Sequence, residues 1–347
     1  MGNYVLYHPK GISGSVPIQI KHSHVYCTDM MMFSLRDALI EQGHSVEIQY
    51  VDIVKPDEER YAVDISIPEL ELEVTELPST LWFLVANKDT NKFVLVDLQD
   101  SPASLARMNG HKNLVFSLIG QFSLERYAVD GMFDLTRMVP FVYCAYYPVH
   151  TREMREEIQE IRRSVDKLDD RLFFYGNNRD GYIHSDRNGT PQKIREVISV
   201  LAEKYPDESC VGSWEDKLPL DEWFKKAATH TISLALPGHQ WCSREHELWT
   251  LGLPVMMYEH THRMAVDLIP NYHYIGVPVG ERLSIGMAKD PELAADRLIQ
   301  THREWIKPEN RWRVDSIAKH GQERMDNYAS PEVIGKTMIS LLELGHW

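Results

Sequence analysis

Short apolar runs alternate with amphipathic stretches along the chain, and this alternation predicts an α/β fold. In the first part, apolar runs at 4–7 and 46–50 flank a helical pattern at 29–42 that Gly43 ends. Two further runs, at 82–86 and 93–97, are joined by turn-forming residues and predict a hairpin. Runs at 114–119 and 138–143 continue the strand pattern. This order of elements is typical of a Rossmann-like domain.

A second alternation begins after a charged helical stretch at 153–168. The pattern predicts further strands at 172–175, 210–211, 231–236 and 254–258, and helices at 191–204, 220–228, 243–251, 291–305, 310–327 and 331–344. We therefore expect an α/β protein of two Rossmann-like domains that face each other across a cleft. The N-terminal domain would span 1–150 and be joined by the C-terminal helix at 331–347, and the second domain would span 151–330.

Composition narrows the classes of partner. The 347 residues are 43% hydrophobic, which is ample for two buried cores. A formal net charge of −14 argues against a generally cationic surface for nucleic acid or membranes, although a local basic groove could coexist with it. The four cysteines show no disulfide or metal spacing, and we see neither a signal peptide nor an apolar run of about 20 residues. These features predict a cytoplasmic protein without a membrane span or bound metal.

One candidate site follows the strand at 231–236. The chain breaks at Pro237 and Gly238 and then enters a helix that carries Arg244 and Glu247. Residues three apart share a helix face, so this pair offers a cation for phosphate and a carboxylate for sugar hydroxyls. The alternative is an ordinary ion pair on a solvated helix face.

Two other strand ends carry polar side chains. The strand at 172–175 is followed by a turn with Gly176, Asn178 and Arg179, and Arg179 with Arg244 would form a diphosphate cradle above helix N-termini. Alternatively, this segment is only a turn. In the first half, Asp97 and Asp100 stand at a strand's carboxyl end, where a turn or helix cap is the competing interpretation.

Three segments carry a resemblance to known enzymes. The run Arg-Glu-His-Glu-Leu-Trp-Thr-Leu-Gly-Leu-Pro-Val-Met-Met at 244–257 resembles the donor-binding segment of GT-B-fold glycosyltransferases, including exostosin-like and bacteriophage DNA-glucosylating members. The Tyr-Gly-Asn-Asn-Arg sequence at 175–179 is similar to the phosphate-binding loop of the phage enzymes, and 97–102 to the context of their catalytic Asp. The resemblance implies donor binding by Gly176, Asn178, Arg179, Gly238, Arg244 and Glu247.

The expected function is therefore transfer of a sugar from a nucleotide-diphosphate sugar to a hydroxyl acceptor. We expect inverting, metal-independent transfer, in which Asp97 or Asp100 is the general base and the arginines stabilise the leaving diphosphate. His22 or His24 is a secondary candidate for the base, and Glu245 competes with Glu247 for the ribose. The donor is a substrate, with a UDP-sugar as first choice, and no other cofactor is expected.

The acceptor is expected to be a saccharide or small molecule bound by the first domain. Four alternatives stay open: retaining chemistry, a transferase that modifies a hydroxymethylated DNA base, a nucleotide-sugar epimerase, and a non-catalytic nucleotide-sugar-binding protein. The charge of −14 makes DNA the less favoured acceptor.

Overall fold

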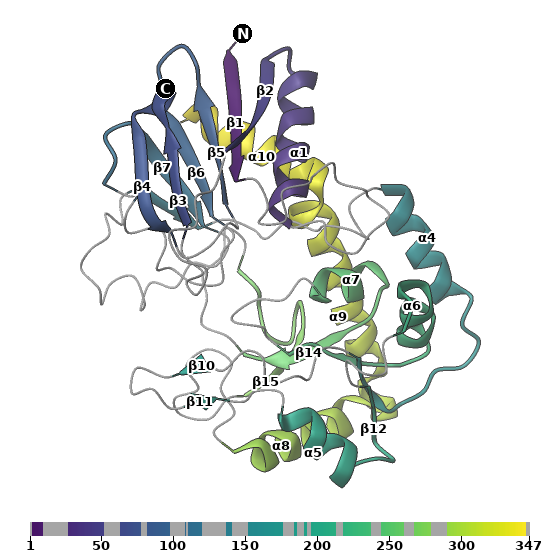
Figure 1. Ribbon diagram of the computed structural model, residues 1–347. Coiled ribbons are helices and arrows are strands. Elements are labelled where there is room, and N and C mark those ends of the chain that lie inside the picture. The colour runs from purple at the N-terminus through teal and green to yellow at the C-terminus, as the bar shows by residue number, and fades with distance from the viewer. Residues whose placement is uncertain are drawn as a thin grey trace. The chain divides into compact units, whose positions relative to one another are not determined.

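The computed structural model (Figure 1) describes residues 2–9, 27–51, 63–77, 82–97, 108, 110–119, 137–140, 152–175, 184–185, 191–192, 196–212, 218–236, 244–259, 267–278 and 290–344. The chain forms two compact units. Unit 1 comprises Met1–His150, His262–Asp267 and Tyr328–Trp347, and unit 2 comprises Thr151–Thr261 and Leu268–Asn327. Each unit contains one principal sheet. Among the described helices, none is long and apolar enough to cross a membrane.

Unit 1 is built on a six-stranded sheet in the order β2-β1-β5-β6-β7-β8. Its strands are β1 (Asn3–Pro9), β2 (Ser45–Val51), β5 (Trp82–Asn87), β6 (Phe93–Asp97), β7 (Leu114–Ile119) and β8 (Met138–Pro140). Strand β5 runs antiparallel to both neighbours, while the other adjacent pairs are parallel. The hairpin predicted at 82–97 is therefore confirmed.

Different elements cover the two faces of this sheet. Helices α1 (Cys27–Glu41) and α10 (Pro331–Leu344) pack against each other, and α1 also contacts β2 and β5. A hairpin of β3 (Val63–Ile67) and β4 (Leu72–Leu77), joined through the short η1 helix (Pro68–Leu70), shares a core with alternate residues of β1, β5 and β6. Alternation within this hairpin buries one set of apolar side chains and leaves the intervening polar residues exposed.

Unit 2 is built on a parallel sheet of β9 (Leu172–Tyr175), β12 (Ser209–Gly212), β13 (Ser233–Leu234), β14 (Val255–Tyr258) and β15 (Ile275–Val277). The spatial order is β12-β9-β13-β14-β15, which is 2-1-3-4-5 in chain order. In doubly wound sheets of this order, ligands bind at the carboxyl ends of strands one and three, where the winding reverses. That position lies between β9 and β13.

The helices of unit 2 follow the sequence pattern with some corrections. They are α4 (Arg152–Arg163), α5 (Glu196–Lys204), α6 (Leu220–Ala228), α7 (Arg244–Thr250), α8 (Pro291–Trp305) and α9 (Arg311–Arg324). The helix predicted from residue 191 was wrong at its start, because Pro191–Gln192 is β11 and pairs with β10 (His184–Ser185). Proline's fixed φ suits a strand edge as well as the first turn of a helix, so the residue type did not decide between them.

Candidate functional site

Arg244 lies at the reversal point of the unit 2 sheet. It is the first residue of α7, the helix that follows β13 along the chain. Its Nη1 donates a hydrogen bond of 2.6 Å to the carbonyl oxygen of Tyr175, the last residue of β9. Arg244, on the helix after β13, therefore reaches the carboxyl end of β9. This is the edge where the topology predicts a ligand.

Trp223 of α6 holds this guanidinium group from another side. The Arg244 Cζ lies 4.9 Å from the centroid of the Trp223 ring, within the range of a cation–π contact. Trp223 also donates from Nε1 to the carbonyl oxygen of Tyr175, at 3.2 Å. One backbone oxygen thus accepts hydrogen bonds from both side chains. Because a guanidinium has five N–H donors, Arg244 keeps donors for a further acceptor after contacting Tyr175.

Glu247 stands one helical turn after Arg244 on the same face of α7. The closest approach is 4.0 Å, between Arg244 Nε and Glu247 Oε2, and the two side chains are 31% and 12% exposed. Burial raises the pKa of Glu247, and the charge of Arg244 opposes that rise. The i,i+3 ion pair of the alternative interpretation is present, but Glu247 is largely buried and Arg244 also reaches across to β9. Glu245, the competing carboxylate, is only 2% exposed.

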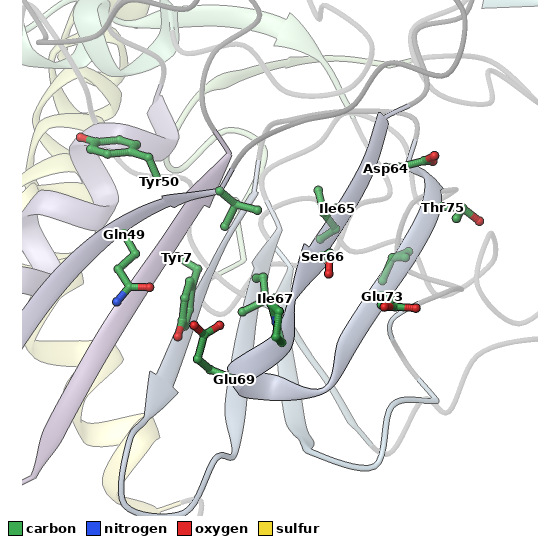
Figure 2. Close-up of a pocket in the computed structure, with 13 residues that line it drawn as sticks. Tyr7, Gln49, Tyr50, Asp64, Ile65, Ser66, Ile67, Glu69, Glu73 and Thr75 are labelled. Carbon is green, nitrogen blue, oxygen red and sulfur yellow. The ribbon is translucent and has the colours of Figure 1, made fainter.

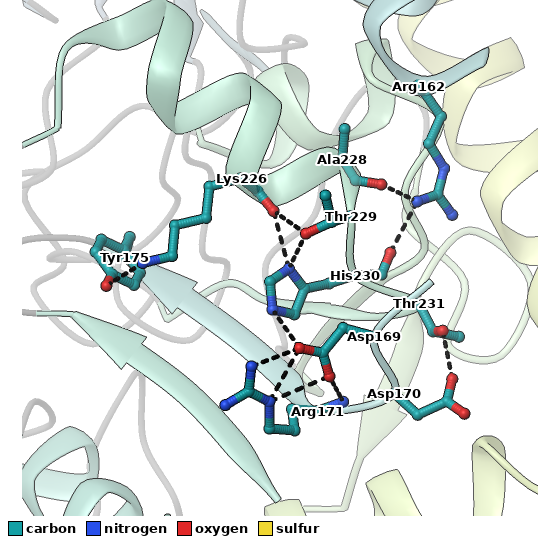
Figure 3. A network of polar contacts seen from close by, with 10 residues as sticks. All are labelled: Arg162, Asp169, Asp170, Arg171, Tyr175, Lys226, Ala228, Thr229, His230 and Thr231. Carbon is teal, nitrogen blue, oxygen red and sulfur yellow. Dashed lines mark hydrogen bonds and ion pairs between the residues drawn. The ribbon is translucent and has the colours of Figure 1, made fainter. Parts of the chain in front are cut away.

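The side chain of Tyr175 is fixed by its neighbours. Its ring stacks on Phe173 with the ring centroids 5.5 Å apart, and the Nζ of Lys226 lies 4.0 Å from the ring centroid. Lys226 also donates to the Tyr175 hydroxyl, as Figure 3 shows. On β12, Gly212 packs against this ring so closely that a Cβ atom there would clash with it. The backbone carbonyl that receives Arg244 therefore belongs to a well-held residue.

The amino edge of the same sheet carries a closed polar network (Figure 3). Arg171 forms a two-oxygen ion pair with Asp169, with the closest contact at 2.6 Å. This pairing lowers the pKa of Asp169 to about 2. The buried His230 lies 3.6 Å from the same carboxylate, and its Nδ1 meets the Lys226 carbonyl oxygen. These contacts tie the start of β9 to the segment before β13, so we regard them as structural.

Asp97 occupies the strand end that the sequence indicated. It is the last residue of β6, pairs with Trp82 of β5 and Ile119 of β7, and is 2% exposed. Among the described residues, no three His, Cys, Asp or Glu side chains gather as a metal site would require.

Several predicted site residues cannot be compared with this geometry. Asp100, Gly176, Asn178, Arg179 and Gly238 lie outside the described residues, as do His22 and His24. Of the predicted donor-binding set, the structure therefore places Arg244 and Glu247 and brings them together. Sequence reasoning missed Trp223 and Lys226, because a helix with apolar and basic residues gives no sign of what lies beside it in space.

Solved structures resemble the chain over most or all of its length. A glycosyltransferase from Rickettsia africae ESF-5 aligns with a TM-score of 0.53 at 9% sequence identity, covering 99% of this chain and 98% of that one. Anabaena HepE, solved with UDP and glucose, aligns with a TM-score of 0.42 at 10% identity, covering 72% and 71%. An alpha-glucosyltransferase solved with UDP-glucose and DNA containing an abasic site gives 0.40 at 12% identity, covering 99% and 100%.

The Rickettsia structure establishes the fold of the chain. No family model matches the sequence, and no curated protein matches it either. The chain shares its fold with this solved glycosyltransferase, and the expected α/β class with Rossmann-like domains of GT-B type is confirmed. At 9% identity the similarity transfers no residue roles.

Proposed function

We propose that the protein transfers a sugar from a nucleotide-diphosphate sugar to a hydroxyl group of an acceptor. The observation that carries this proposal is the placement of Arg244 and Glu247 at the reversal point of a parallel sheet, in a chain with a glycosyltransferase fold. A cation and a carboxylate at this edge match the two ends of a ribose diphosphate. The proposed donor is a UDP-sugar, and it is a substrate rather than a cofactor.

In the proposed donor complex, Arg244 contacts the diphosphate while Glu247 accepts hydrogen bonds from the ribose hydroxyls. Gly176, Asn178 and Arg179 after β9, and Gly238 after β13, would complete the phosphate site from the adjoining loops. Arg244 suits this role because Trp223 and the Tyr175 carbonyl hold it in place before the donor arrives. Positive charge from Arg244 and Arg179 would stabilise the negative charge on the leaving diphosphate, so we propose transfer without a metal ion.

The proposed reaction inverts the anomeric carbon. The acceptor oxygen attacks that carbon, its proton passes to Asp97 or Asp100, and the bond to the diphosphate breaks with the electron pair leaving on the nucleotide. Arg244 stabilises the charge that develops there. Asp97 is nearly buried, so it could act only on an acceptor seated against the end of β6. We place the acceptor, a saccharide or small molecule, on unit 1 and the donor on unit 2.

A binding and turnover screen tests the proposal. The protein is titrated calorimetrically with UDP, GDP, ADP and CMP, and then incubated with UDP-sugars while free UDP and altered sugar are measured. We expect UDP to bind. In the absence of an acceptor, we expect the UDP-sugars to be hydrolysed slowly and to release free UDP. An isomerised sugar would indicate an epimerase, and binding without turnover a non-catalytic protein. If no nucleotide binds, the proposal is wrong.

A matched pair of arginine variants locates the site. Arg244→Gln should weaken nucleotide binding roughly 10- to 100-fold, because a charge-assisted hydrogen bond contributes about 1.5–3 kcal/mol. Arg303→Gln is the control, since Arg303 lies on α8 and pairs with Glu208 at 2.5 Å, immediately before β12. This variant should keep the wild-type affinity. Equal effects from both substitutions would show that general charge, rather than the edge of the sheet, governs binding.

A further inference from the structure

A hollow of about 500 Å³ lies in unit 1, between the β3–β4 hairpin and strands β1 and β2 (Figure 2). Its volume falls within the range of small-molecule sites, roughly 300–1,000 Å³. Apolar side chains of the hairpin and of β2, including Ile65, Ile67 and Val51, form part of its wall. The hollow belongs to unit 1, whereas the carboxyl end of β9 belongs to unit 2, so the hollow requires its own explanation.

Tyr7 of β1 brings a hydroxyl group to this hollow. Its side chain is 5% exposed and belongs to the core beneath the hairpin. Figure 2 shows the hydroxyl pointing toward the carboxylate of Glu69. No described residue gives or receives a hydrogen bond with this hydroxyl group. Burial, Glu69 and Glu47 together raise the pKa of Tyr7 to about 12, so the phenol stays neutral at physiological pH.

The Tyr7 hydroxyl group opens onto the hollow and has no hydrogen-bond partner among the described residues, so a ligand in the hollow would supply one.

The charged side chains that line the hollow among the described residues are all acidic. They are Asp64, Glu69 and Glu73, and no described lining residue is a lysine or arginine. Glu69 is exposed at the η1 turn and forms no ion pair with any described residue. Glu47, which lies close by, is already bonded to Lys88 and Gln49. An anionic ligand would be repelled here and a cation attracted.

The polar atoms that face one another are mainly acceptors. The Nε2 of Gln49 is committed to Glu47 at 2.7 Å, which leaves its Oε1 as an acceptor. The Tyr7 hydroxyl oxygen and the Glu69 carboxylate are the other two groups, and Figure 2 draws Gln49 and Glu69 on either side of Tyr7 among the residues that line the hollow. A primary ammonium group has three N–H donors and a positive charge, so it complements three acceptors beside a carboxylate.

We propose that this hollow binds a small molecule through a primary ammonium group, which is held by Tyr7, Gln49 and Glu69. The site lies within unit 1 and does not depend on sugar transfer. It would give the protein a preference for an amine-bearing ligand over the corresponding neutral or acetylated one.

Binding of glucosamine and N-acetylglucosamine, measured by calorimetry at pH 6, tests this proposal. The two probes share a sugar ring, but only glucosamine carries an ammonium group. We expect glucosamine to bind at least tenfold more tightly, because acetylation removes the charge and two N–H donors. Equal affinities would overturn the proposal by showing that the ring hydroxyls are recognised instead. Failure of glucosamine to bind at all would also overturn it.

Three variants assign the contacts. Glu69→Gln should weaken glucosamine binding roughly tenfold or more, and Tyr7→Phe about two- to tenfold, with thermal unfolding recorded to show that both remain folded. Glu71→Gln is the control, because Glu71 follows the same turn but pairs with Lys112. It should bind glucosamine as the wild type does. A loss in the control as large as that in Glu69→Gln would refute a specific site. Nucleotide affinity should stay unchanged in Glu69→Gln, which separates this proposal from the proposed transfer.

Discussion

Replacing Glu247 with Gln should stabilise the protein, or leave its stability unchanged, while weakening the donor complex. Burial raises the pKa of this carboxyl group, so the folded state disfavours its ionised form. A group with a raised folded pKa stabilises the protein below its unfolded pKa, and this contribution is lost as pH rises through the folded value. At pH 7 the charge on Glu247 therefore opposes folding. Its ion-pair partner Arg244 lies 4.0 Å away, beyond hydrogen-bond distance, and compensates only in part.

The effect on donor binding has the opposite sign. In the proposed complex, the carboxylate accepts hydrogen bonds from two ribose hydroxyls, each contributing about 1.5–3 kcal/mol, and neutral hydrogen bonds are roughly half as strong. The amide keeps one acceptor oxygen and replaces the other with a donor. We expect a loss of about 2–3 kcal/mol, which corresponds to a dissociation constant raised roughly 30- to 150-fold.

Two measurements on the same variant test this reasoning. Calorimetric titration with UDP at pH 7 gives the affinity, and denaturant unfolding at pH 7 and pH 4 gives the stability. Glu203→Gln is the control, because Glu203 is exposed on α5 and should change neither quantity. Wild-type affinity in Glu247→Gln would refute its role at the ribose. A loss of stability at pH 7 would show instead that Glu247 is a structural residue of α7.

Three further changes probe the site and its support. Trp223→Phe should weaken UDP binding about three- to tenfold, because Arg244 loses the indole that stacks on it and donates to the same Tyr175 carbonyl oxygen. Unchanged affinity in calorimetry would show that Arg244 does not need this support. Asp97→Asn should lower the transfer rate at least about 100-fold with UDP affinity unchanged, whereas a wild-type rate would exclude it as the base. Asp169→Asn should destabilise the protein at pH 7 by at most about 2 kcal/mol, because the pKa of Asp169, about 2 in the folded state, lies below its usual value near 3.8. That contribution is present above pH 4 and is lost as pH falls toward 2. The difference in free energy of unfolding between wild type and variant should therefore be smaller at pH 2.5 than at pH 7. An equal difference at both pH values would contradict this.

Helices with clear local signals were predicted at the bounds that the structure shows. The helix at 291–305 is an example, because Asp290 caps its N-terminus by accepting a 3.0 Å hydrogen bond from the Leu293 amide and Pro291 occupies the first turn. The stretches at 220–228 and 331–344 were also predicted with their observed limits. In each case the apolar spacing alone, or together with a cap as at Asp290, is sufficient to predict the helix.

Features that depend on distant residues were beyond the sequence. The acceptor for Arg244 is a backbone oxygen of Tyr175, and every residue type carries such an oxygen, so no pattern indicates it. Trp223 lies 21 positions before Arg244, and its indole looks like any core side chain until the fold places it beside the guanidinium. The β3–β4 hairpin falls in an acidic, proline-broken stretch, where its hollow could not be anticipated. Sequence could identify charged residues near a sheet edge but not their partners.

The ion pairs at the two edges of the unit 2 sheet differ in how closely their charged groups approach, and this contrast supports a ligand at the carboxyl edge. At the amino edge, Arg171 closes on Asp169 at 2.6 Å, as expected of a structural ion pair. At the carboxyl edge, Arg244 donates to the Tyr175 carbonyl and forms only a looser ion pair with Glu247, at 4.0 Å. Both groups therefore keep hydrogen-bonding capacity for a further partner. A ligand with an anionic group for Arg244 and hydroxyl donors for Glu247 would satisfy both charges at once.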